Sequence, residues 1–253
     1  MLRKTFLSYM AFSVFMPLAL VGGAGPQSPA QPTPALIVGR NVAARGGLRA
    51  WQAVQTMAFS GKMDAGGKQN VQLPFVLEMK RPRKTRLELE FGNSKAVQIY
   101  DGVNGWKLRP FLGRTDIEPY SPEEITSASM ESDLDGLLVD YVTKGTVVEL
   151  AGTEQVEGHD AYKLKLTMKG NRVRHVWVDS QSFLEVKIEG TPRRLDGKFR
   201  PVQVYLRDYK SVNGLLVPYT QETLVEGYKP SHKMIIESVV VNPTLEDSRF
   251  AKP

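Results

Sequence analysis

Cysteine is absent from this chain of 253 residues. The absence excludes disulfide bonds, thiol chemistry, cysteine-ligated metals and a lipid-modified N-terminal cysteine. The fold must therefore be stabilised by its core. A hydrophobic content of 42% with 24% charged residues is enough for a sizeable one, and the length allows one large β domain or two small ones.

Residue patterns that support catalysis are also missing. The histidines His159, His175 and His232 are isolated and lack the spacing of a metal-binding motif, and the sequence contains no nucleophile elbow and no phosphate-binding loop. The acidic run at 131–136 begins like a calcium loop, but its twelfth position is Val142, where a bidentate glutamate is required. We therefore expect no enzymatic activity, no cofactor and no metal site.

A strong excess of one charge is missing as well. The net charge is +6, and it falls to +4 if Arg3 and Lys4 leave with a targeting peptide. The remaining basic residues are spread along strand ends and mixed with acids. We therefore expect no nucleic-acid partner.

The N-terminus has the pattern of a secretory signal peptide. Arg3 and Lys4 provide a positive region, and an almost wholly apolar stretch follows over 6–21. A membrane anchor is the alternative interpretation. About 16 apolar residues interrupted by Pro17 are short for a membrane span, however, so cleavage is favoured.

Small residues after this stretch offer two cleavage positions, Ala24 and Ala30. We expect a signal peptide over 1–24 and a Pro-rich linker over 25–34, whose uncharged composition cannot bury enough surface to order itself. The mature product is then expected to be a soluble periplasmic protein.

Alternation of apolar and polar residues dominates the rest of the chain. Every second residue over 71–79 is apolar, and the pattern resumes at Leu87 after a basic turn. A period of two places such side chains on one face of a pleated strand. Asp-Gly at 101–102 and Asn-Gly at 104–105 supply the residues that tight hairpins require. Similar strands continue over 146–240, so we expect about eleven antiparallel strands.

Two segments have helical periodicity. The first, at 36–54, carries an apolar stripe that is interrupted by Gly46 and Gly47. The second, at 121–141, begins with the N-cap residue Ser121 and a proline, followed by two acids. We expect these helices to cover part of the sheet.

The dimensions of these elements indicate a curled sheet. Eleven strands about 4.8 Å apart would be roughly 50 Å wide, whereas one helix covers only roughly 10 Å. The apolar face therefore has to curl on itself, and either side chains or a ligand must fill the interior. Periodicity leaves a packed core and a ligand cavity equally open.

An ordered set of short motifs resembles a known family, the LolA-like periplasmic carriers of outer-membrane lipoproteins, over about residues 36–253. The group called outer-membrane lipoprotein-sorting proteins is the most similar. The motifs are Lys80-Arg81-Pro82, Arg86, Asp101-Gly102, Trp106, Pro110, Val156-Glu157-Gly158, Val178-Asp179, Phe183-Leu184, Val212-Asn213-Gly214-Leu215, Pro218, Asn242-Pro243-Thr244-Leu245, Phe250 and Pro253.

The resemblance implies that residues 35–253 form a lipid- or lipoprotein-binding domain. Its mainly β fold would be an open half-barrel whose concave apolar face is covered by helices and receives acyl chains. Arg81 would be a lid residue that holds the carbonyl groups of a helix or loop. The expected lining residues of the cavity are Phe75, Leu77, Leu89, Phe91, Trp106, Leu164, Leu166, Met168, Trp177, Val186, Met234 and Ile236.

The family also implies partners. We expect a monomeric carrier that moves lipoprotein acyl chains or lipid between a membrane-protein donor and acceptor, toward the outer membrane. The alternative is a lipid-sensing regulatory module that binds a membrane-anchored partner. Two features depart from the family pattern, the insertion at 121–141 and the arginine-rich loop at Arg193-Arg194.

Overall fold

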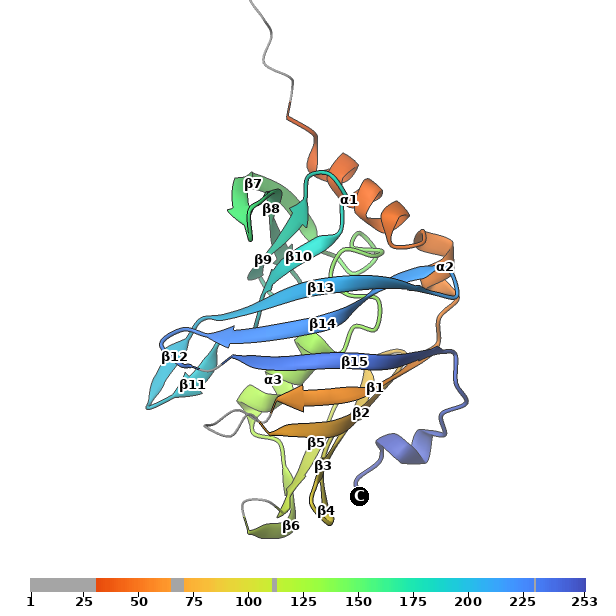
Figure 1. Cartoon of the computed structure of the whole chain (residues 1–253), viewed down its shortest axis with the longest axis vertical. Helices are drawn as coiled ribbons and strands as arrows, with labels where there is room; N and C mark the ends of the chain where they lie inside the picture. Colours follow the sequence, from red (N-terminus) through yellow and green to blue (C-terminus); the bar gives the residue numbers. More distant parts are fainter. Residues whose placement is uncertain (1–30, 65–70, 111–112, 230) are drawn as a thin grey trace, which may run out of the picture. The chain divides into compact units, whose positions relative to one another are not determined.

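A computed structural model describes residues 31–64, 71–110, 113–229 and 231–253. The expected signal peptide and most of the expected linker lie outside the described residues. Residues Pro32–Pro253 form one compact unit, which is mainly β (Figure 1). No helix in the described ranges is both long and apolar enough to cross a bilayer.

The main structural element is a single antiparallel sheet of thirteen strands, in the order β6-β5-β4-β3-β2-β1-β15-β14-β13-β10-β9-β8-β7. A separate two-stranded hairpin, β11–β12, is inserted between β10 and β13. The strands are β1 (Thr56–Asp64), β2 (Gln72–Lys80), β3 (Lys84–Phe91), β4 (Ser94–Tyr100), β5 (Gly105–Arg109), β6 (Arg114–Pro119), β7 (Val147–Val156), β8 (His159–Met168), β9 (Arg172–Asp179), β10 (Glu185–Glu189), β11 (Arg193–Leu195), β12 (Lys198–Arg200), β13 (Val202–Val212), β14 (Leu215–Val225) and β15 (His232–Val241).

The sheet consists of two meanders joined by the pairing of β1 with β15. The strands β6 and β7 lie at opposite edges, so the sheet is open and is not a closed barrel. The expected antiparallel topology is confirmed.

The expected number of strands was too low. The strands that the alternation did not reveal are β1 and β6, together with the hairpin β11–β12. In β1 the alternation is broken because Gly61 takes the place of an apolar side chain, and β6 has Ile117 as its only large apolar residue. Both strands are specified by their neighbours in the sheet more than by their own composition.

The first helical segment is divided as the glycines predicted. Helix α1 (Pro34–Ala44) is capped by Thr33, and the short helix α2 (Leu48–Gln52) follows the two glycines. Gly46 has φ +113°, and a Cβ atom there would lie 2.4 Å from the carbonyl oxygen of Gly214. A glycine is therefore required where this turn approaches the β13–β14 hairpin.

The second helical segment is shorter than predicted. Helix α3 (Pro122–Glu131) has the expected cap at Ser121, but it ends before the apolar stripe, and residues 134–145 form turns. Within this stretch Leu134, Leu137 and Leu138 are nevertheless buried against the sheet clusters. We call residues 132–146 the anchored segment.

Four clusters of buried apolar side chains lie on the two faces of the sheet. On the inner face, two clusters pack beneath α1, α2 and the anchored segment, with Val42 of α1 touching both. On the outer face, one cluster packs beneath the C-terminal tail through Leu245 and Phe250, and another is centred on Trp177. The main core of the domain therefore lies on the inner face, near the helices.

Helix α3 shows that the sheet curves around its inner face. At its N-terminal end Glu124 binds Lys107 of β5, and at its other end Glu131 interacts electrostatically with Arg174 of β9. A helix of this length extends only about 15 Å, yet β5 and β9 would be about 40 Å apart in a flat sheet. The difference indicates that both halves of the sheet bend toward α3.

Candidate functional site

The inner face contains nine of the twelve residues expected to line a cavity. The strand register places Phe75 opposite Leu89, and Met63 opposite Met234. The nine residues fall into two groups, because those from β8 pack with α1 and most of the others pack with α2. They are Phe75, Leu77, Leu89, Phe91, Leu164, Leu166, Met168, Met234 and Ile236.

Trp106 does not belong to this set. It pairs with Ile99 of β4, and both pack in the outer-face cluster that contains Phe250 of the C-terminal tail. The prediction failed because β4 carries apolar side chains on both faces, so alternation alone does not show which side faces inward.

Trp177 and Val186 also lie on the outer face. They pack around Val156, and the indole N–H of Trp177 donates a 2.7 Å hydrogen bond to Glu154. The ammonium of Lys187 lies 3.7 Å from the centre of the indole ring. This tryptophan therefore packs among charged groups on the side of the sheet away from the helices.

Burial on the inner face changes along the strands. At the end near α2, which we call the covered end, Met57 and Leu215 are 0% and 2% exposed. Toward the opposite end Phe75 is still buried, at 2% exposed, but the apolar side chains around and beyond it are only partly buried, and Phe91 is 47% exposed. We call this the open end; its residues are Met63, Leu73, Leu89, Phe91 and Met234.

Helix α3 crosses the inner face without packing tightly into it. None of its residues is buried, and its contacts at the N-terminal end are ionic. Glu124 lies 2.6 Å from Lys107, and Glu123 lies 3.8 Å from Arg194. Burial raises the pKa of the Glu124 carboxyl, but Lys107 and the capping N–H of Ser121 together bring that pKa below its ordinary value.

Arg81 connects the segments that cover the inner face at the covered end. Its guanidinium donates hydrogen bonds to the carbonyl oxygens of Val54 at 2.7 Å and Trp51 at 3.1 Å, and to the Asp135 carboxylate at 2.8 Å. It therefore joins α2 to the anchored segment. These are the kinds of contact that the resemblance implied for a lid arginine.

Asp135 is the centre of this arrangement. Its side chain is 4% exposed and also accepts a 2.6 Å hydrogen bond from Lys144. Burial alone would raise the pKa of the Asp135 carboxyl, but Lys144 and Arg81 hold that pKa below its ordinary value. No direct signal for this role was present in the sequence, because Asp135 stood in an acidic run that resembled part of a calcium loop.

Arg45 completes the polar layer beneath the helices. It lies 3.2 Å from Glu185 of β10, stacks at 4.5 Å on the ring of Trp51, and donates to the carbonyl oxygen of Asp135 at 3.1 Å. The covered end is therefore held by specific ion pairs as well as by apolar packing. Among the described residues no cluster of side chains could hold a metal ion.

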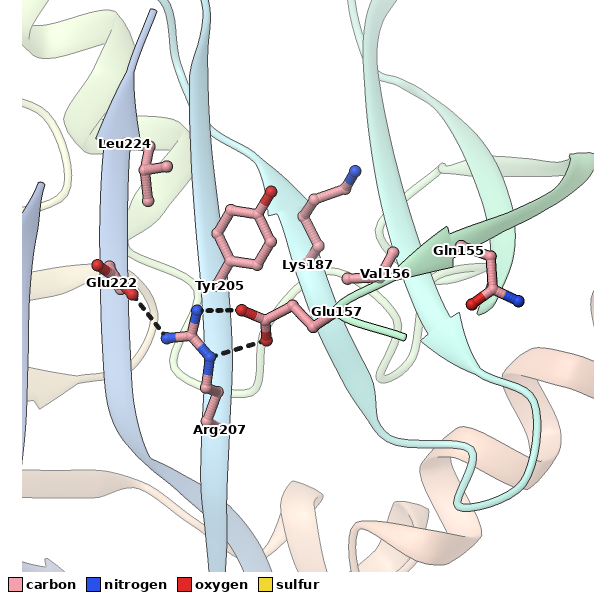
Figure 2. A pocket seen from close by; sticks show the side chains of 8 residues that line it. All are labelled: Gln155, Val156, Glu157, Lys187, Tyr205, Arg207, Glu222 and Leu224. Carbon is pink, nitrogen blue, oxygen red and sulfur yellow. Dashed lines mark hydrogen bonds and ion pairs between the residues drawn. The ribbon is translucent and has the colours of Figure 1, made fainter. Parts of the chain in front are cut away.

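The outer face carries a hollow of about 340 Å³ that is lined by residues of β7, β10, β13 and β14 (Figure 2). Arg207 binds Glu157 and Glu222, each at 2.8 Å, and Figure 2 shows it between the two carboxylates. The guanidinium is thus engaged in joining the β7–β8 turn to β13 and β14. This hollow is polar and lies on the opposite side of the sheet from the open end.

Comparisons with known proteins show similarity in structure alone. No family model and no curated protein matches the chain. A LolA superfamily protein from Nitrosomonas europaea is 14% identical with a TM-score of 0.58, covering 88% of this chain and 99% of its own. A domain described as an outer membrane lipoprotein-sorting protein, from Vibrio parahaemolyticus, is 14% identical with a TM-score of 0.55, covering 85% of this chain and 95% of its own.

A DUF1329 family protein from Desulfovibrio piger is also similar, with 16% identity, a TM-score of 0.56, and coverage of 87% of this chain and 98% of its own. Identities this low establish the fold and not the activity. Since the matched structures are covered almost completely, the likeness extends over the whole β domain. The resemblance seen in the sequence is confirmed at this level: the chain has the LolA-like fold.

Proposed function

We propose that this protein is a soluble periplasmic carrier that shields the acyl chains of a lipoprotein or lipid on its inner face during transfer toward the outer membrane. Its partners would be a donor and an acceptor in the two membranes. The LolA-like fold supports this class of function.

The observation that carries the proposal is the contrast between the two ends of the inner face. A packed core would bury its apolar side chains throughout. Here Met57 is fully buried at the covered end, whereas Met63, on the same face of the same strand, is partly exposed. The open end therefore offers apolar surface for a ligand within the curve of the sheet.

Methionine and leucine side chains at the open end suit a variable apolar ligand. Met63 and Met234 are direct cross-strand partners, and their unbranched side chains can adapt to different chain lengths. Burying an acyl chain releases about 0.8 kcal/mol of free energy for each methylene removed from water. The donor and acceptor membranes offer a similar free-energy gain. Transfer is then close to neutral and requires no catalytic group.

Helix α3 and Arg81 would control access. Because α3 buries none of its residues, moving it away from the sheet exposes little additional core. Arg81 holds α2 and the anchored segment together through three hydrogen bonds. In this proposal it stabilises the closed, empty state, and a ligand shifts the population toward an open state.

The test is titration with a fluorescent fatty-acyl probe. We expect saturable binding that unlabelled lipid displaces. Leu89→Glu, at the open end, should weaken binding by at least about tenfold, because an unpaired carboxylate is costly in an apolar site. Val173→Glu is the matched control, since Val173 is 47% exposed on the outer face of β9.

The control should bind the probe like the wild type. Circular dichroism and thermal unfolding establish that both variants are folded. If the folded wild type takes up no probe, the inner face is a packed core and the carrier proposal is refuted. A module that recognises other proteins would then be the better explanation.

A further inference from the structure

The β11–β12 hairpin is an unusual concentration of positive charge. It contains Arg193, Arg194, Lys198 and Arg200 against one acid, Asp196. That acid lies in the turn and accepts a hydrogen bond from the hydroxyl of Tyr228. One basic residue of the hairpin also has an acidic neighbour outside it, since Arg194 lies 3.8 Å from Glu123 of α3.

The basic side chains are poorly compensated within the protein. Arg193 and Arg200 are direct cross-strand partners, an arrangement in which like charges repel. Across the ranges that the structure describes, Arg193, Lys198 and Arg200 form no ion pair, and the buried Nε of Arg200 has no hydrogen-bond partner. An anionic partner would relieve this repulsion.

An exposed aromatic side chain accompanies these charges. Phe199 is 63% exposed. It lies directly opposite Arg194 across the hairpin, and the Arg194 side chain is 58% exposed. A phenyl ring beside guanidinium and ammonium groups matches the boundary between lipid headgroups and acyl chains, where aromatic residues insert and basic residues bind phosphate.

The hairpin lies at the open end of the inner face. It leads into β13 at Val202, which pairs with Val225 at the end of β14. The next strand, β15, begins beside this end, where Met234 pairs with Met63. Figure 1 shows the hairpin projecting beyond the ends of β13 and β14, on the side away from α1 and α2.

We propose that the β11–β12 hairpin binds the surface of a bilayer that contains anionic phospholipid, with Phe199 in the interfacial layer and the basic residues against lipid phosphates. This membrane binding rests on the proposed carrier function, because it would serve lipid transfer: in this orientation the open end faces the membrane. A bilayer is favoured over an acidic protein because the exposed phenyl ring and the uncompensated charges occupy one small projecting element.

The absence of cysteine makes a direct test possible. A single cysteine introduced by Phe199→Cys can carry an environment-sensitive fluorophore without background labelling. Val103→Cys is the matched control, because Val103 is a 72% exposed apolar residue at the tip of another turn. Each labelled protein is mixed with vesicles of phosphatidylcholine, with or without phosphatidylglycerol.

We expect the label at 199 to brighten and shift to shorter wavelength only with phosphatidylglycerol, and the label at 103 to remain unchanged. In unlabelled protein, Arg193→Gln with Lys198→Gln should weaken vesicle binding about fivefold for each charge removed. Removing two exposed charges elsewhere, by Arg49→Gln with Lys252→Gln, should leave binding near the wild-type level.

The acyl-probe titration separates this proposal from the carrier function. The hairpin variants should bind the probe normally, and Leu89→Glu should still bind vesicles. If the label at 199 stays dim on phosphatidylglycerol vesicles while the wild type binds the acyl probe, the membrane proposal is overturned and the carrier function stands. A label that brightens equally on phosphatidylcholine alone would overturn the assigned role of the basic residues.

Discussion

The two ends of the inner face are built on the same strands but are covered in different ways. At the covered end, α1, α2 and the anchored segment bury large side chains such as Trp51 and Leu138, and ion pairs around Asp135 fix them. At the open end, α3 buries none of its residues. One end of the curled sheet therefore stabilises the fold, while the other keeps apolar surface accessible.

The largest effect expected from this comparison is on stability. Leu164→Ala, in the fully buried group beneath α1, should lower the free energy of unfolding by about 3 kcal/mol, through lost burial and a new cavity. The same substitution at the partly buried Leu89 should cost only about 1 kcal/mol. Urea unfolding measures both values. Equal losses would mean that the open end is packed as tightly as the covered end.

The three hydrogen bonds that Arg81 donates to Val54, Trp51 and Asp135 form what we call the latch of the covered end. Removing the latch should have the next largest effect on stability. Arg81→Leu removes three hydrogen bonds and should cost about 2 kcal/mol, a value reduced for the partial exposure of Arg81. Binding of the acyl probe should be unchanged or tighter, with slower release, because the closed and empty state loses stabilisation.

Arg83→Leu is the control for the latch. Arg83 is 44% exposed and contacts Asp133 of the same anchored segment at 3.0 Å, but its loss should cost less than about 1 kcal/mol and leave release unchanged. Unfolding measurements and stopped-flow displacement of the probe compare the two. Faster release from the Arg81 variant would contradict the proposed latch.

The covered end should also be sensitive to acid through Asp135. Its pKa in the folded protein is held below the ordinary value of 3.8, so the stabilisation from its ion pairs is present above that pH and is lost as the pH falls through the folded pKa. Asp135→Asn removes this contribution. The variant should be less stable than the wild type at neutral pH, and the difference should shrink in acid. A constant difference across the acid range would exclude the linkage.

The smallest expected difference concerns the two helix caps. Thr33 caps α1 and Ser121 caps α3, and replacing such a cap by alanine costs about 1 kcal/mol of helix stability. Because α1 contributes to the core, Thr33→Ala should lower global stability. Ser121→Ala should instead accelerate hydrogen exchange within α3 and leave global unfolding almost unchanged. A global loss with Ser121→Ala would show that α3 is part of the cooperative core.

Part of this architecture could be predicted from the sequence because strand alternation and turn chemistry are local. The glycines after α1 and the cap of α3 were identified correctly for that reason. The length of the second helical segment was not, because residues after Glu131 are fixed by Arg45 and Arg81 from elsewhere in the chain, as well as by Lys144 within the anchored segment. Such long-range contacts leave no periodic signal.

The assignment of residues to the inner face had the same limit. Nine expected lining residues lie there, but the two tryptophans at 106 and 177 face outward. The strand of Trp177, β9, is apolar on both sides, and so is β4, the strand that pairs with Trp106. The cross-strand register decides the face. For Trp106, the C-terminal tail through Phe250 provides the cover that makes an apolar outer face stable. Neither condition can be read from a single strand.

The most direct test of the central claim uses the methionine methyl groups of the protein as reporters. Spectra of methyl-labelled protein are recorded with a fatty acid that carries a paramagnetic nitroxide on its chain. If acyl chains bind at the open end, the Met63 and Met234 signals should broaden strongly, with little change at Met57, which is 0% exposed at the covered end. Uniform broadening, or broadening at neither open-end methionine, would contradict binding at the open end.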